Sequence, residues 1–151
     1  MPSIEIVCVG QTEVSDFSDA PFCLRAEGEL VSHRSPKPLF KPEFDATAGC
    51  IYHLCNPDGS YNAFELLRMG HYNKRRLWKG MVGFRPEYAP YVRQMLAQLL
   101  KDSPTHKVIF TSDYQFGPNV RRYHSPISQR KFWQLHHARR LHMNALYHLR
   151  P

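Results

Sequence analysis

The chain has 151 residues with a net charge of +7, a hydrophobic content of 42% and an aromatic content of 13%. A chain of this length fits one domain and can bury roughly two-thirds of its unfolded surface, so it needs neither disulfides nor metals to fold. No apolar run approaches the roughly 18–20 residues of a membrane span, and the N-terminus lacks the pattern of a signal peptide. We therefore expect a single domain, residues 1–151, that does not contact membranes and lies in the cytoplasm, with four free cysteine thiols.

The charge is unevenly distributed along the chain. Residues 1–60 hold 4 Lys or Arg against 9 Asp or Glu, a net of −5, whereas residues 61–151 hold 16 against 4, a net of +12. From Tyr114 to the end there is no acidic residue, against seven Lys or Arg and five His. A field of this sign attracts anions such as nucleic acid, nucleotides, acidic proteins or anionic lipid.

Strands and turns are expected in the first sixty residues. Ile4, Ile6 and Cys8 alternate with other residues within Ser3–Val9, which predicts an opening strand. The other elements expected here are a hairpin of Phe22–Ala26 and Glu29–His33 around Glu27 and Gly28, an irregular proline-containing segment Ser35–Asp45, a strand Gly49–Cys55 and a turn Asn56–Gly59.

The middle of the chain contains two expected helices. Asn62 is a candidate N-cap for a short helix, Ala63–Met69. The basic and aromatic segment 71–79 supports no assignment, and Gly80–Phe84 is a candidate short strand. A longer helix is predicted at Pro90–Lys101, because proline suits the first turn and apolar residues follow at helical spacing. These apolar residues are Val92, Met95, Leu96, Leu99 and Leu100.

The C-terminal third predicts two strands and a helix. Lys107–Tyr114 has a continuous apolar centre, which is typical of a strand covered on both faces. Gln115–Pro126 is expected to be a loop, Ser128 to cap a helix that ends near Leu141, and Met143–Leu149 to form a last strand. A helix between the last two strands permits a parallel crossover. The fold class is therefore α+β: one domain with a mixed or mostly antiparallel sheet of five to six strands and two to three helices packed on it.

The final helix is the main candidate binding site. At 100° per residue, its inward side is predicted to carry Phe132, Leu135, Ala138 and His142. The opposite, outward side is predicted to carry Arg130, Trp133, His137 and Arg140. Arginine binds phosphates through two parallel hydrogen bonds and tryptophan offers a stacking surface to a base, so this pattern indicates nucleic-acid binding. The alternative is that another segment covers Trp133 as a core residue.

Three residues before this helix extend the predicted binding surface. Arg121, Arg122 and Tyr123 lie in the expected loop, close to the helix in sequence. With His124, and together with Lys74, Arg75 and Arg76, they are predicted to line one basic groove. The alternative is that these residues are separate, solvated surface charges.

Nine histidines raise the question of catalysis. RNA cleavage without a metal needs a general base, a general acid and a cation near the phosphate. The weak candidates for these roles are His33, His53, Asp113 and His137. The alternative for Asp113 is a structural carboxylate that accepts backbone N–H groups or pairs with a nearby arginine, and no recognised catalytic spacing is present.

A zinc site at Cys50, His53 and Cys55 is not expected. In a strand, Cys50 faces one way while His53 and Cys55 face the other, so the three side chains cannot bind one ion. His53 and Cys55 could share an ion, but they would need two more ligands from elsewhere in the chain. We therefore predict no metal and no cofactor, and we interpret the four cysteines as small buried residues.

Three functions remain open from the sequence. The first is a non-enzymatic binding protein that presents a basic, aromatic face to an anionic partner, most simply nucleic acid. The second is a metal-independent ribonuclease or phosphodiesterase that uses His and Arg. The third is a protein–protein module, such as an inhibitor or an antitoxin-like protein, that docks an acidic protein partner.

Overall fold

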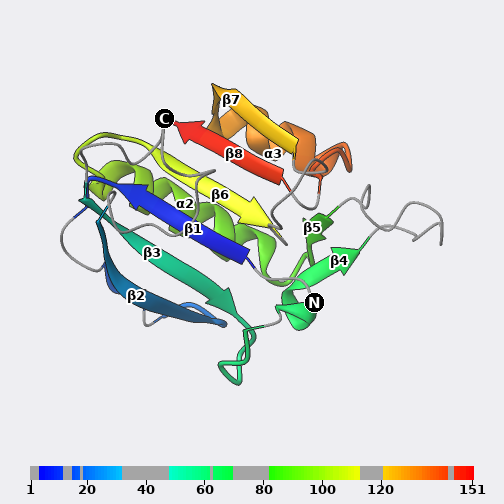
Figure 1. Ribbon diagram of the computed structural model, residues 1–151. Coiled ribbons are helices and arrows are strands. Elements are labelled where there is room, and N and C mark those ends of the chain that lie inside the picture. Colours follow the sequence, from blue (N-terminus) through cyan, green and yellow to red (C-terminus); the bar gives the residue numbers. More distant parts are fainter. Residues whose placement is uncertain are drawn as a thin grey trace.

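In the described part of the chain, a six-stranded sheet carries two helices on one of its faces (Figure 1). The computed structural model describes residues 4–11, 15–17, 19–31, 48–61, 63–69, 82–112, 121–142 and 145–151. Its main sheet has the order β2-β3-β1-β6-β8-β7, and a second, two-stranded sheet pairs β4 with β5. The main-sheet strands are β1 Ile4–Val9, β2 Cys23–Val31, β3 Ala48–Cys55, β6 Val108–Ser112, β7 Arg121–Ser128 and β8 Ala145–Arg150.

The sheet is mixed, and its pairing confirms the α+β prediction. All neighbouring strands of the main sheet run antiparallel except β7 and β8, which are parallel and are joined by helix α3, Gln129–His137. The parallel crossover therefore connects β7 to β8. The two strands predicted from Lys107–Tyr114 and Met143–Leu149, now β6 and β8, are antiparallel neighbours instead.

Strand β7 replaces a predicted loop. The segment before the last helix contains Pro126, which cannot donate a ladder hydrogen bond. Proline is nevertheless accepted here because β7 is the edge strand of the sheet and its pairing with β8 shifts between Tyr123 and Ile127. The predicted loop location of Arg121, Arg122 and Tyr123 is therefore wrong, since their backbone lies in this strand.

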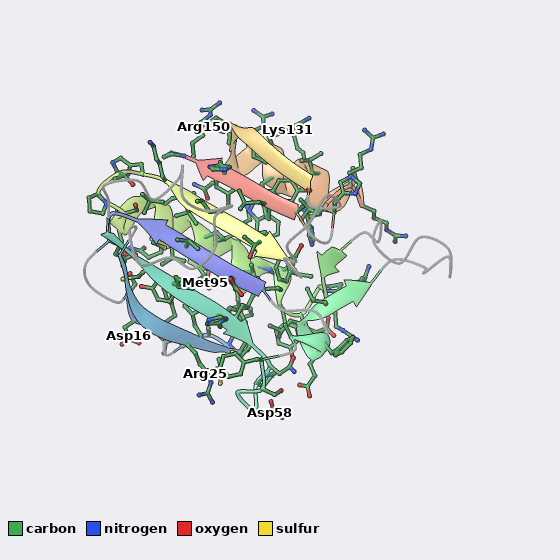
Figure 2. All side chains as sticks on the ribbon, in the orientation of Figure 1. Asp16, Arg25, Asp58, Met95, Lys131 and Arg150 are labelled. Atoms are coloured by element: carbon green, nitrogen blue, oxygen red, sulfur yellow. The ribbon has the colours of Figure 1, made fainter. Side chains whose placement is uncertain are left out.

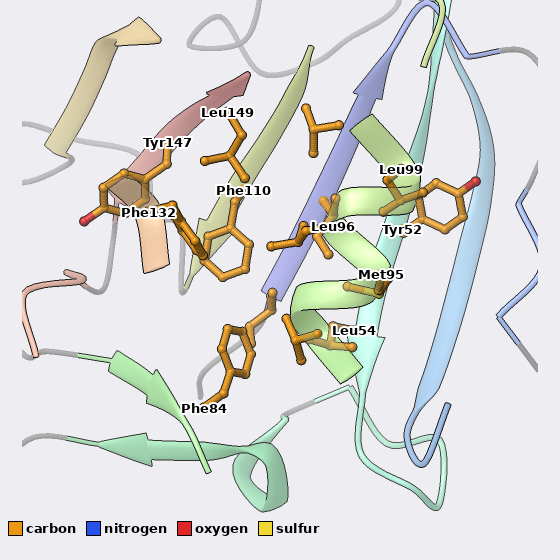
Figure 3. Close-up of a cluster of buried hydrophobic side chains, with 14 of the residues drawn as sticks. Tyr52, Leu54, Phe84, Met95, Leu96, Leu99, Phe110, Phe132, Tyr147 and Leu149 are labelled. Carbon is orange, nitrogen blue, oxygen red and sulfur yellow. The ribbon is translucent and has the colours of Figure 1, made fainter. Parts of the chain in front are cut away.

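Helix α2 packs its apolar stripe on the middle of the sheet (Figure 3). It spans Ala89–Asp102, which confirms the helix predicted at Pro90–Lys101. All five predicted stripe residues are buried: Val92, Met95, Leu96, Leu99 and Leu100. At its C-terminus the Ser103 N–H donates to the Leu99 carbonyl at 2.9 Å, and the Ser103 hydroxyl donates to the Val9 carbonyl at 2.9 Å. These bonds tie the end of the helix to β1.

Two predicted elements have a different local structure. The expected hairpin near Glu27 and Gly28 is one strand, β2, whose pairing with β3 shifts between Ala26 and Glu29. Instead of a helix at Ala63–Met69, a 3-10 turn Phe64–Leu66 leads into β4, Leu67–Met69, which pairs with β5, Val82–Phe84. The backbone N–H of Glu65 donates to the Asn56 side-chain oxygen at 3.0 Å. Asn56 follows β3, and its side chain thus satisfies a backbone donor of the 3-10 turn.

Helix α3 is shorter than predicted. The Ser128 hydroxyl accepts a hydrogen bond from the Lys131 N–H at 3.1 Å, which confirms Ser128 as the cap. The helix ends at His137 because Arg139 adopts a left-handed conformation, φ 57°, and the Arg140 N–H donates back to the Leu135 carbonyl at 2.8 Å. The reversal brings Leu141 into the core ahead of β8.

Apolar residues are buried on both faces of the sheet. The larger cluster lies between the sheet and the two helices and includes Phe110 and Tyr147. A smaller cluster of Val7, Val9, Ile109 and Leu146 lies on the opposite face, which we call the far face. Burial of the whole of β6 confirms the prediction that this strand is covered on both faces. In the described part of the chain, no helix is long and apolar enough to cross a membrane.

Candidate functional site

The exposed side of α3 carries a concentration of positive charge. We define the α3 basic face by the exposed Arg130, Lys131, His137, Arg139 and Arg140, of which the last two belong to the turn after the helix. No acidic residue occurs anywhere in the sequence between Tyr114 and the C-terminus, so nothing within this segment neutralises the face. In Figure 2, Lys131 lies at the start of α3, along the same edge of the molecule as Arg150.

Trp133 does not belong to this face. Its side chain is only 2% exposed, so the prediction of an outward tryptophan is wrong and the alternative of a core residue is confirmed. The indole packs against Phe84, Phe132 and His136, at ring-centroid distances of 6.2, 5.2 and 5.0 Å. Helix α3 thus buries two adjacent sides: Phe132 contacts Phe110 and Tyr147 of the main sheet, while Trp133 contacts Phe84 of the small sheet.

The predicted inward side of the helix is also only partly correct. Phe132 is fully buried and Leu135 is half-buried against the core. Ala138 is exposed, because the helix has already ended at this residue and the chain is turning away. His142 is half-buried, and its backbone N–H donates to the Tyr147 hydroxyl at 2.9 Å.

Two arginines from other elements extend the charge around α3. Arg93 of α2 is exposed, and its guanidinium carbon lies 6.0 Å from the Trp133 ring centroid. Arg68 of β4 is exposed and close enough to lower the pKa of His136 by charge repulsion. Arginines from α2 and β4 therefore lie beside the aromatic cluster that Trp133 and His136 of α3 form with Phe84. For Arg121, Arg122 and Tyr123, only the backbone of β7 is described, and it leads directly into the cap of α3.

His136 is a residue of this region whose role the sequence pattern did not predict. The Phe84 N–H donates to His136 Nε2 at 2.9 Å, and the two rings stack with centroids 5.9 Å apart. Burial, followed by the neighbouring His137 and Arg68, lowers the pKa of His136 to about 4. The ring is therefore neutral at pH 7, and it holds α3 against β5. Only its position, three residues after Trp133, could have indicated that it faces inward.

The catalytic candidates are not assembled into one site. His53 lies on β3 opposite Glu5 of β1, on the far face of the sheet. His137 is exposed on α3, which packs on the other face. His53 and His137 therefore lie on opposite sides of the sheet and cannot act on the same phosphate. His33 and Asp113 fall outside the described residues.

The cysteines are positioned as structural residues. Cys8, Cys50 and Cys55 are buried and Cys23 is half-buried, and all four are free thiols. Burial raises the pKa of the Cys8 and Cys55 thiols, which makes them poor nucleophiles at neutral pH. Cys50 lies with Tyr52 and Leu54 in the cluster that faces the helices, on the opposite face of the sheet from His53. Within the described residues, no group of three or more His, Cys, Asp or Glu side chains could hold a metal ion.

The fold and this surface define a small α+β protein with a basic helical face. Comparison with protein-family models, with curated proteins and with solved structures finds no match for the chain. The arrangement of its own residues is therefore the basis for a function.

Proposed function

We propose that this protein binds a polyanion through the α3 basic face, and that the polyanion is nucleic acid. One observation carries the proposal: the exposed ionisable side chains of α3 and its C-terminal turn are all Arg, Lys or His, and none is acidic. Arg68 and Arg93 add positive charge from two further elements. Arginine side chains match the geometry of phosphate oxygens, so a row of them suits a phosphate backbone.

Contacts to phosphates, without base stacking, are the expected mode of recognition. Trp133 is buried and cannot stack on a base. Phosphate contacts fix position and orientation but do not read sequence. We therefore expect binding that depends strongly on salt and weakly on nucleic-acid sequence. The cytoplasm remains the proposed compartment, consistent with four free thiols.

The two alternatives from the sequence stay predictions. A ribonuclease would need catalytic partners for His53 or His137 other than each other, because the two lie on opposite sides of the sheet. An acidic protein partner would be attracted by the same arginines. A steep salt dependence favours phosphates in particular, because nucleic acid releases condensed counterions on binding.

The test is fluorescence anisotropy with labelled single-stranded RNA and DNA between about 50 and about 200 mM salt. Removing one cation that binds a phosphate lowers the magnitude of the log–log salt slope by about one. The triple variant Arg130→Gln, Lys131→Gln and Arg140→Gln should therefore bind more weakly and reduce this slope by about 2–3.

Lys101→Gln is the matched control, because Lys101 is exposed in the last turn of α2 and lies outside the α3 basic face. It should leave both affinity and slope close to wild type. The proposal fails if the triple variant, folded by circular dichroism, binds nucleic acid with the wild-type affinity and slope.

A further inference from the structure

A cavity lies at the end of the main sheet where β6 begins and β8 ends. Its volume is about 540 Å³, within the range of small-molecule sites. Its described lining combines apolar residues, including Val9 and Ile109, with four basic or imidazole side chains. These four are His106, Lys107, His148 and Arg150. We call this cavity the strand-end pocket.

The strand register explains why these side chains meet. Val108 of β6 pairs with Leu149 of β8, and Ile109 pairs with His148. Lys107, one residue before Val108, therefore lies opposite Arg150, one residue after Leu149. Since side chains alternate along a strand, Lys107, Ile109, His148 and Arg150 all belong to the far face of the sheet. The strand-end pocket thus takes its charged strand residues from the far face of the sheet, whereas Val108 and Leu149 of its lining belong to the helix-facing cluster.

Among the described lining residues, the positive charges of the strand-end pocket have no acidic counterpart. Like charges directly opposite each other on neighbouring strands are destabilising. In addition, Arg150 pairs with Ser128 of β7, the cap of α3, so the positive end of the helix dipole lies at the same edge of the sheet. A bound anion would relieve this repulsion.

The lining of the pocket suits an anion that carries a further, apolar group. Two permanent cations with two histidines suit a dianion, and a phosphate monoester carries a charge of about −1.5 to −2 at neutral pH. Arg150 can bind two phosphate oxygens in parallel, while Lys107 supplies a point charge. The same cavity has apolar lining residues: Val9 and Ile109, which are largely buried, and Pro126 of β7, which is exposed. This apolar side suits a flat or apolar group attached to the phosphate.

We propose that the strand-end pocket binds a phosphate monoester that carries a planar group, which is the chemistry of a mononucleotide. Lys107 and Arg150 hold the phosphate, and the apolar side of the pocket, where Pro126 is exposed, contacts the planar group. The site is separate from the α3 basic face and does not depend on the function proposed for it. The same chemistry is offered by a free nucleotide and by the phosphorylated end of a nucleic-acid strand.

The experiment is isothermal titration of the full chain with the four nucleoside 5′-monophosphates, with inorganic phosphate and with adenosine. At least one monophosphate should bind with a Kd below about 1 mM, and both inorganic phosphate and adenosine should bind at least about tenfold more weakly. Lys107→Gln and Arg150→Gln should each weaken the monophosphate at least about tenfold.

Lys101→Gln is the matched control, because it removes an exposed lysine that belongs neither to the described lining of the strand-end pocket nor to the α3 basic face. It should change nucleotide affinity less than about twofold. Nucleotide binding that survives both pocket variants overturns the proposal. So does the absence of binding by every monophosphate up to about 1 mM. A failure of the α3 variants in the nucleic-acid assay leaves these readouts unchanged, so the two proposals are judged separately.

Competition separates the two sources of the phosphate. A short oligonucleotide with a 5′-phosphate that displaces the mononucleotide, while its 5′-hydroxyl counterpart does not, identifies strand ends as the ligand. A mononucleotide that neither oligonucleotide displaces identifies free nucleotides. Both results support the pocket. Equal displacement by the two oligonucleotides contradicts it, because the terminal phosphate would then contribute nothing.

Discussion

His136 connects α3 to the small sheet through a single neutral imidazole. The Phe84 N–H donates to Nε2, so this nitrogen carries no proton and the neutral ring holds its proton on Nδ1. A protonated ring would carry hydrogen on both nitrogens and could not accept the bond. Nδ1 is buried and, among the described residues, has no hydrogen-bond partner. The charged form is therefore disfavoured twice, by burial and by loss of the Phe84 bond.

Acid should weaken the fold through this residue. The pKa of His136 is lowered from 6.5 to about 4, so the unfolded chain binds a proton at a higher pH than the folded chain does. The resulting stability is fully present above pH 6.5 and is lost as the pH falls through about 4. We expect a loss of about 2–3 kcal/mol across this interval, measured by urea unfolding at a series of pH values.

His136→Gln is the control for this pH effect, because a glutamine oxygen can accept the Phe84 bond but does not titrate. The variant should show a flatter dependence of stability on pH between about 6.5 and 4 than wild type does. Identical pH profiles for the two proteins would show that His136 does not carry the effect.

At the scale of single elements, α2 is the main support of the sheet. Its buried stripe includes Met95, Leu96 and Leu99, which pack beside Tyr52 and Leu54 of β3 (Figure 3). The stripe is readable from the sequence because it follows helical spacing from Val92 to Leu100, over about two and a half turns. The same reasoning succeeded for β1, whose alternating residues face the helices and the far face in turn.

Leu99→Ala should create a cavity beneath α2. The side chain is fully buried, and its truncation should lower the free energy of unfolding by about 2–5 kcal/mol in chemical denaturation. Gln94→Ala, at an exposed position of the same helix, should change it by less than about 0.5 kcal/mol. Equal effects of the two substitutions would mean that this helix face does not pack on the core.

For the whole molecule, the dominant feature is the charge difference between the two parts of the chain. Residues 61–151 carry a net charge of +12, and much of it is presented on the α3 basic face and at the strand-end pocket. Concentrated like charge destabilises a folded chain through self-repulsion, and salt screens that repulsion. Stability and anion binding are therefore linked through the same side chains.

Salt should raise the melting temperature. Between about 50 and about 300 mM sodium chloride we expect an increase of about 3 °C, equivalent to about 1 kcal/mol, measured by circular dichroism. The triple variant of the α3 basic face should show a smaller rise, because three of the repelling charges are gone. A melting temperature that falls with salt in the wild-type protein would contradict the idea of net repulsion.

Local pattern alone determined the α+β class, the positions of α2, β1 and β6, and the excess of positive charge in the C-terminal part. These features depend on neighbours within one turn or one strand, so periodicity and charge counts predict them. Tertiary structure alone decided that Trp133 is buried and that residues 121–128 form an edge strand. It also brought Lys107 and Arg150 together in the lining of one cavity. Trp133 was misplaced because a helical pattern assumes one buried side, whereas α3 packs against two sheets. The strand contacts could not be predicted because the register of distant strands has no local signature in the sequence.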